Sequence, residues 1–188
     1  IEKINWDDWV KTIKINLFGS ILLCRAVMPY FKKNNKGKII QLSGGGASNP
    51  LPLISGYAVS KVGIVRFIEN LAAEVKKYNI DINAVAPGAI NTNMLEEVLR
   101  AGPKKIGTYY YNKALKQKKL GGTSFKTACD LILFLGSKYS DGIKGKLVSA
   151  LWDDWKNWPN YKKILLNSDT YTLRRIIGRD RGFNWGDK

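Results

Sequence analysis

Tyr57 and Lys61 are the residues of this chain whose types and spacing most clearly permit chemistry. They stand four residues apart in "SGYAVSK", and on a helix positions i and i+4 share one face. A lysine ammonium near a phenol favours the phenolate and lowers the pKa of the tyrosine from about 10. Such a tyrosine can exchange a proton with an alcohol or a carbonyl compound. The alternative is an ordinary exposed tyrosine and lysine, because this spacing is common by chance.

Three consecutive glycines, Gly44 to Gly46, precede this pair in "LSGGGASNP". They match neither the spacing of a dinucleotide-binding loop nor that of a P-loop, so they do not predict a phosphate cradle. They indicate a sharp turn or room for a ligand after a strand, which is where ligands bind in open α/β sheets. The chain has no histidine, which excludes Ser-His-Asp and Cys-His catalysis and argues against a zinc site. We expect no metal.

The elements that must position these residues alternate along the chain. The apolar pattern predicts helices over 6–33, 56–78 and 124–138, with Ser124 as the N-cap of the last. Short apolar runs bounded by glycine or proline predict strands over 38–43, 80–87 and 145–151. Residues 92–122 read as polar and irregular around one short helix, "NMLEEVLRA". This order predicts an α/β fold, a parallel sheet covered by helices.

The composition sets limits on function. Of 188 residues 45% are hydrophobic, which fits a globular domain, and no apolar run is long enough to span a membrane. The net charge of +16 fits either a polyanion-binding surface or a solvated lysine-rich surface. Because the lysines are scattered and no nucleic-acid-binding motif accompanies them, we favour the second. Cys24 and Cys129 lie in apolar surroundings and predict reduced core thiols of a cytoplasmic protein.

The C-terminal part differs from the rest. We predict two units, a catalytic domain over 1–151 and a tail over 152–188 that packs on it as helix and loop. The tail is rich in tryptophan and carries four of the seven arginines, between 174 and 181. These arginines either bind an anionic substrate or pair with nearby aspartates, and we favour the pairing.

Four segments in order resemble the short-chain dehydrogenase/reductase family. They are "IKINLFG", "IIQLSGGGASNPLPLISGYAVSK", "INAVAPGAINTNM" and "GIKGKLVSA". The resemblance implies a Rossmann-like, doubly wound parallel sheet and an NAD(P)-dependent oxidoreductase that interconverts an alcohol and a carbonyl. It implies that Tyr57 is the general acid/base, that Lys61 binds the cofactor ribose, and that Asn16 binds a water of a proton relay. The implied nicotinamide-binding residues are Pro87, Gly88, Ile90 and Thr92.

The resemblance also implies a homodimer or homotetramer acting on a small alcohol or carbonyl substrate, with a sugar-related compound as one option. The rival hypothesis is a non-catalytic protein on the same fold that binds polyanions through its basic surface. Sequence alone decides neither the substrate nor the choice between NAD and NADP.

The sequence departs from the family pattern at two places. The family serine usually lies 13 residues before the tyrosine, where this chain has Gly44, whereas Ser43 lies 14 before it. We expect Ser43 to turn inward and take the role; the alternatives are that the role is missing or is filled by another group such as Ser55. The first strands and the glycine-rich cofactor loop are not among these residues, so we expect a sheet truncated at its N-terminus. We therefore expect residues 1–188 alone to be inactive and to bind NAD(P)H poorly.

Overall fold

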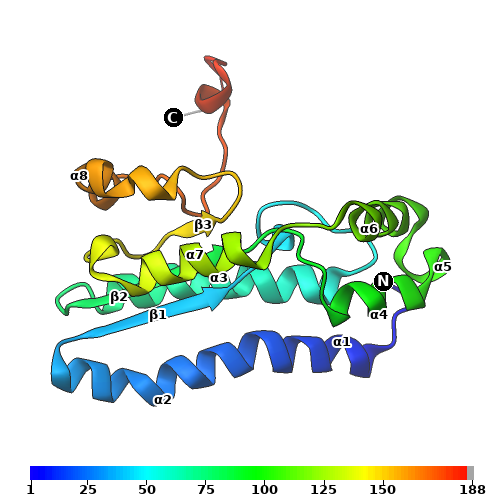
Figure 1. Cartoon of the computed structure of the whole chain (residues 1–188), viewed down its shortest axis with the longest axis horizontal. Coiled ribbons are helices and arrows are strands. Elements are labelled where there is room, and N and C mark those ends of the chain that lie inside the picture. The colour runs from blue at the N-terminus through cyan, green and yellow to red at the C-terminus, as the bar shows by residue number, and fades with distance from the viewer. Residues whose placement is uncertain (186–188) are drawn as a thin grey trace.

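A computed structural model describes residues 1–185 and shows a three-stranded parallel sheet between two layers of helices (Figure 1). The strands are β1 (Gly37–Leu42), β2 (Ile80–Ala86) and β3 (Leu147–Ser149), in the order β1-β2-β3. β1 and β2 pair in register from Gly37↔Ile80 to Leu42↔Val85. The predicted α/β architecture is confirmed, with a third strand shorter than expected.

The helices divide between the two faces of the sheet. α1 (Trp6–Ile13), a π-helical turn (Lys14–Phe18) and α2 (Gly19–Asn34) run as one long rod beside α3 (Ser55–Glu74), while α7 (Phe125–Gly136) covers the other face (Figure 1). One core cluster joins α2 and α3 to the sheet through residues such as Met28, Ile68 and Ile82, and a second joins α7 through Leu131 and Leu135. Two cores on opposite faces explain why β2 is buried over residues 80–85.

Local signals account for several helix ends. Asn5 accepts a hydrogen bond from the Asp8 amide and caps α1. Ser124 caps α7 in the same way, as predicted. α2 ends at Asn34, and its C-cap residue Asn35 has the left-handed φ of 46° that asparagine tolerates. α3 ends at Glu74, earlier than the predicted 78.

The short helix "NMLEEVLRA" predicted within residues 92–122 is confirmed, but the irregular structure predicted around it is wrong. This segment forms three helices, α4 (Asn93–Ala101), α5 (Pro103–Ile106) and α6 (Thr108–Leu120), separated by Gly102 and Gly107 with positive φ. Each helix buries few residues, among them Leu95, Ile106 and Ala114, so the apolar signal along the sequence is weak.

The first part of the tail, residues 152–173, is held against the domain. A 3-10 segment (Trp155–Tyr161) and α8 (Lys162–Asn167) insert Trp155, Trp158 and Leu165 into the second core. The buried ammonium of Lys146 donates to the carbonyls of Ser168 and Thr170, both at 2.9 Å. Beyond residue 173 the chain leaves the body of the molecule and forms the 3-10 turn Gly178–Arg181 (Figure 1).

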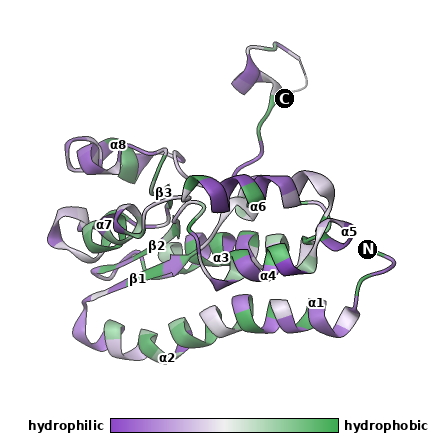
Figure 2. Cartoon of the chain, turned by 45° about the vertical axis from the view of Figure 1, so that its right-hand side comes forward, coloured by the Kyte–Doolittle hydropathy of each residue, from purple (hydrophilic) through white to green (hydrophobic). Residues whose placement is uncertain are grey.

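Two surface features complete the fold. Cys24 is buried as expected, but Cys129 is exposed, because α7 turns Ala128 and Leu131 inward instead. Figure 2 shows hydrophobic segments along the α1–α2 rod. Exposed large side chains of this rod include Ile15, Phe18, Leu22, Leu23 and Tyr30. Within residues 1–185 no helix is long and apolar enough to cross a membrane.

Candidate active site

The carboxyl ends of β1 and β2 bring the predicted site segments together. The Ser43 amide donates to the Val85 carbonyl at 2.8 Å, which extends the pairing of Leu42 with Val85 beyond the strands. The glycine loop after β1 and the Pro87–Thr92 segment after β2 therefore leave the same edge of the sheet. This is the edge at which open α/β sheets bind ligands.

Tyr57 and Lys61 lie on the first turns of α3, and the structure places them side by side. The Lys61 ammonium is 5.6 Å from the centre of the Tyr57 ring and donates to the Leu42 carbonyl at 3.0 Å. This bond ties the lysine to the end of β1. The i, i+4 spacing on α3 and the hydrogen bond to the end of β1 thus hold the Tyr57 and Lys61 side chains close together.

The electrostatics of the pair differ from the expectation. Burial raises the pKa of Tyr57 above its ordinary value, and the nearby phenol of Tyr110 raises it further. Burial lowers the pKa of Lys61. Burial of the phenol therefore sets the direction of the Tyr57 pKa, which lies above its ordinary value and not below it as expected.

Gly44, and not Ser43, faces the Tyr57 hydroxyl. A Cβ added at Gly44 would lie 2.6 Å from the Tyr57 hydroxyl oxygen. Gly44 is extended, so its neighbour projects to the opposite side. The buried Ser43 hydroxyl accordingly donates to the backbone carbonyl of Lys61 at 3.3 Å. The structure does not bring Ser43 to the tyrosine hydroxyl, and the expected inward turn is absent.

Asn16 lies in the π-helical turn between α1 and α2, which sequence analysis did not predict. Its side-chain amide donates to the Ser60 hydroxyl at 3.2 Å, and Ser60 donates to the Tyr57 carbonyl at 2.7 Å. The Asn16 carbonyl accepts from Ser20 at 2.7 Å. π-Helical turns occur often at functional sites, and this one brings Asn16 to the helix that carries Tyr57 and Lys61.

The segment after β2 forms the other wall. Gly88 has a φ of +89°, a conformation that favours glycine. The turn is held by Thr123, whose amide donates to the Ala89 carbonyl at 2.8 Å. Ile90 is half-buried, and Thr92 is exposed, precedes α4 and does not use its hydroxyl to cap that helix. Pro87 directly follows β2.

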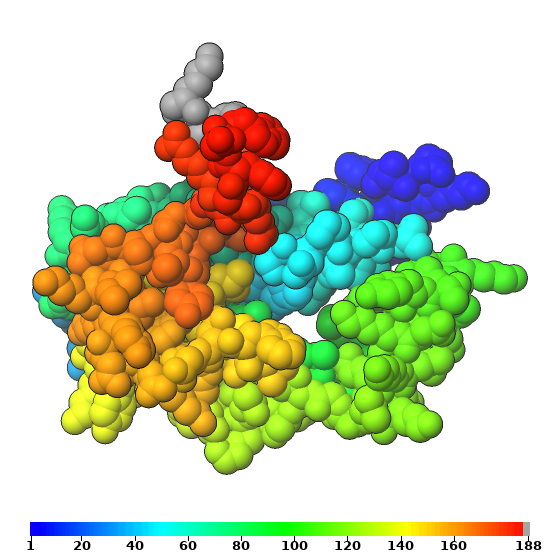
Figure 3. All heavy atoms as spheres, turned by 90° about the horizontal axis from the view of Figure 1, so that it is seen from above, coloured from blue at the N-terminus to red at the C-terminus, as the bar shows by residue number. Residues whose placement is uncertain are grey.

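Helix α6 lies across the open side of this edge. Figure 3 shows the surface hollowed between the cyan segment around residue 50 and the green helices α4–α6. Leu53, on the cyan rim, has a strained φ of +68°, and its side chain lies near Gly107 at the start of α6. Tyr110, on the inner part of α6, was missed by sequence analysis; its helical spacing with Ala114 and Gln117 was the available signal.

A second hollow opens on the other side of Tyr57. It has a volume of about 280 Å³ and lies between α1 and the start of α3. Its walls include Asn5, Asp8, Trp9, Ser55 and Tyr57. The indole of Trp9 donates to the Ser55 hydroxyl at 3.1 Å, which fixes the wall beside the tyrosine.

Fold and site together define a Rossmann-like α/β protein with a tyrosine–lysine pair at the ligand-binding edge of its sheet. The chain belongs to the short-chain dehydrogenase family, whose model matches residues 1–102. The resemblance inferred from the sequence is confirmed.

Relatives support this assignment. The chain is 30% identical over 140 residues to dehydrogenase/reductase SDR family member 4 of Sus scrofa, covering 74% of this chain and 48% of the relative. It is 33% identical over 144 residues to the 3-oxoacyl-(acyl-carrier-protein) reductase of Thermotoga maritima, covering 76% and 55%. The chain thus spans about half the length of the curated relatives it matches.

Solved structures share the fold. A 3-oxoacyl-(acyl-carrier protein) reductase of Brucella melitensis with bound NAD matches with a TM-score of 0.57 and 27% identity, over 79% of this chain and 52% of that one. A sorbitol-6-phosphate 2-dehydrogenase of Erwinia amylovora matches with a TM-score of 0.69 and 22% identity, over 79% and 60%. The second likeness concerns the fold alone.

Proposed function

We propose that the full-length protein is an NAD(P)-dependent oxidoreductase that interconverts an alcohol and a carbonyl, with Tyr57 as the general acid/base. The observation that carries the proposal is the Tyr57 hydroxyl itself. It lies at the carboxyl edge of the sheet beside Lys61, and within residues 1–185 it has no protein hydrogen-bond partner. Membership of the family and the NAD-bound relative from Brucella melitensis support the choice of chemistry.

The residues present fit a nicotinamide cofactor. The Lys61 ammonium has three donors and uses one on the Leu42 carbonyl, which leaves two for the hydroxyls of a ribose. The exposed Thr92 hydroxyl is available to a carboxamide, and the turn at Pro87, Gly88 and Ile90 forms the adjoining wall. When bound, the nicotinamide supplies or accepts the hydride.

The chain's own residues handle the proton. In reduction, the Tyr57 phenol donates its proton to the carbonyl oxygen as that oxygen gains negative charge. In oxidation, the phenolate takes the alcohol proton. Lys61 stabilises the phenolate, and Asn16 holds the helix turn that carries both groups through Ser60. Because burial raises the pKa of Tyr57, oxidation should increase with pH and reduction should be favoured at lower pH.

The test is a screen of the full-length protein against a panel of alcohols, aldehydes and ketones, with NAD(H) and NADP(H) absorbance as the readout. We expect turnover with at least one pair, and a loss of roughly 10²–10⁴-fold in Tyr57→Phe. Tyr139→Phe, at an exposed position away from the site, is the matched control. Turnover near that of the wild type in Tyr57→Phe would refute the mechanism.

We also propose that the protein assembles as a homodimer or homotetramer through the α1–α2 rod and α3. The exposed apolar side chains on these helices include Phe18, Leu22, Leu23 and Val59. A second copy of the same face would remove them from water, and symmetric packing of this kind is the common form of assembly.

A further inference from the structure

The proposed site lacks one hydroxyl. A side chain at position 44 would face the Tyr57 hydroxyl oxygen, but the residue there is glycine. The Ser43 hydroxyl donates a hydrogen bond to the Lys61 backbone carbonyl instead. A carbonyl oxygen that gains charge during reduction is stabilised by hydrogen-bond donors besides the group that protonates it. A second hydrogen-bond donor to the substrate oxygen must therefore come from another element, or the site works with Tyr57 as its one donor.

One face of α6 contacts the segment that borders this site. Tyr110, Ala114 and Gln117 stand at i, i+4 and i+7 and share that face. Ala114 is buried, and the Gln117 amide donates to the Ile90 carbonyl at 3.2 Å and to the Asn91 side chain at 3.1 Å. The far end of this face thus contacts the segment after β2.

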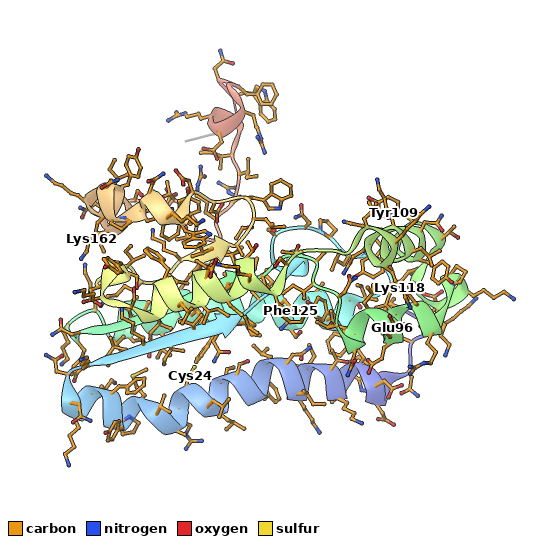
Figure 4. All side chains as sticks on the ribbon, viewed as in Figure 1. Cys24, Glu96, Tyr109, Lys118, Phe125 and Lys162 are labelled. Carbon is orange, nitrogen blue, oxygen red and sulfur yellow. The ribbon has the colours of Figure 1, made fainter. Side chains whose placement is uncertain are left out.

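The start of α6 meets the opposite rim. A Cβ added at Gly107 would lie 3.0 Å from the Leu53 side chain, in the loop that leads to Tyr57. α6 therefore bridges the two rims of the hollow in Figure 3, and Tyr110 lies one turn from the Leu53 contact. Figure 4 shows that the neighbouring Tyr109, 83% exposed, projects away from the domain.

Tyr57 and Tyr110 are both half-buried. Burial raises the pKa of Tyr110, and a charge on Tyr110 would raise the pKa of Tyr57 in turn. Like charges placed close together do not form easily, so one phenol stays protonated while the other ionises. Neither hydroxyl has a protein hydrogen-bond partner in the described part of the chain, which leaves both for a ligand.

We propose that Tyr110 is a second catalytic hydroxyl, donating a hydrogen bond to the same substrate oxygen that Tyr57 protonates, in place of a side chain at Gly44. The proposal rests on the proposed oxidoreductase function. Tyr57 transfers the proton, and Tyr110 keeps its own proton throughout, so the proton and hydride balance of the reaction is unchanged.

The first test is kinetic and uses the full-length protein with the substrate that gives the highest turnover in the screen above. Tyr110→Phe removes one hydroxyl and keeps the ring. We expect kcat to fall by roughly 10²–10³-fold, the scale for one donor to a developing oxyanion. Tyr109→Phe, on the adjacent and outward-facing position, should retain wild-type kcat. A wild-type kcat in Tyr110→Phe would overturn the proposal.

The second test needs no substrate. Tyrosine labelled with 13C at Cζ reports the titration of each phenol by NMR, and Tyr57 and Tyr110 are assigned from their Phe variants. We expect the pKa of Tyr57 to fall in Tyr110→Phe and to stay unchanged in Tyr109→Phe. An unchanged Tyr57 titration in Tyr110→Phe would show that the two phenols do not face one another and would overturn the proposal.

The outcomes separate the two ideas. If Tyr57→Phe keeps its turnover, the proposed function fails. If Tyr57→Phe is inactive and Tyr110→Phe is as active as the wild type, only the role of Tyr110 fails.

Discussion

Gly44→Ala should impair the enzyme although alanine is the smallest possible addition. The new methyl carbon would lie 2.6 Å from the Tyr57 hydroxyl oxygen, whereas ordinary contacts begin at 3.4 Å. Either the phenol or the loop must move by roughly 0.8 Å to relieve this contact. Gly44 is extended, which any residue can adopt, so the damage should arise from this contact and not from backbone strain.

The expected size follows from the sensitivity of catalysis to position. A displacement of about 1 Å of a reacting group can cost about 10²-fold in rate. We therefore expect kcat of the full-length protein to fall by roughly 10- to 100-fold in Gly44→Ala. Gly44→Ser imposes the same carbon but adds a donor beside the substrate oxygen, so it should retain more turnover than the alanine variant.

Ser43→Ala is the matched control one residue earlier. It removes a hydroxyl that bonds to the Lys61 carbonyl and leaves the Tyr57 environment intact. We expect wild-type kcat within a few-fold and a loss of about 1 kcal/mol in the free energy of unfolding, the net worth of one neutral hydrogen bond.

Steady-state kinetics and urea unfolding of Gly44→Ala, Gly44→Ser and Ser43→Ala test whether position 44 or position 43 faces the Tyr57 hydroxyl. The assignment of the facing position to Gly44 would be refuted if Gly44→Ala were as active as the wild type while Ser43→Ala lost 10²-fold or more, because Ser43 would then be the catalytic serine.

Further predictions concern stability and assembly. Lys146→Met removes two charged hydrogen bonds to tail carbonyls and should lower the free energy of unfolding by about 2 kcal/mol in urea, whereas the exposed Lys138→Met should change it little. Burial lowers the pKa of Lys146, so the folded state binds the lysine proton less tightly than the unfolded state does. The free energy of unfolding should therefore rise with pH between the folded-state pKa of Lys146 and about 10.4, its unfolded-state value. This pH dependence should be absent in Lys146→Met. Ile68→Ala, at a fully buried position, should cost about 2–5 kcal/mol in the same assay. Leu22→Lys combined with Leu23→Lys should shift the full-length protein toward monomer in light scattering; a wild-type mass would exclude this face as the interface.

Much of the fold was predictable because its signals are local. The apolar stripes of α3 and α7 repeat at helical spacing, and the runs of β1 and β2 are bounded by glycine and proline. α5 and α6 bury few residues, so their periodicity was too weak to predict them, whereas the short helix α4 was predicted. The exposure of Cys129 depended on which face of α7 meets the sheet.

The sequence by itself determined the Tyr57–Lys61 pair, because i, i+4 contact is a property of any helix. Only the tertiary structure decided that Gly44 and not Ser43 faces the phenol, since this depends on how the end of β1 lies against α3. It also decided the direction of the Tyr57 pKa. Desolvation and charge interactions are summed over groups that lie far apart in the sequence, and only packing brings those groups together.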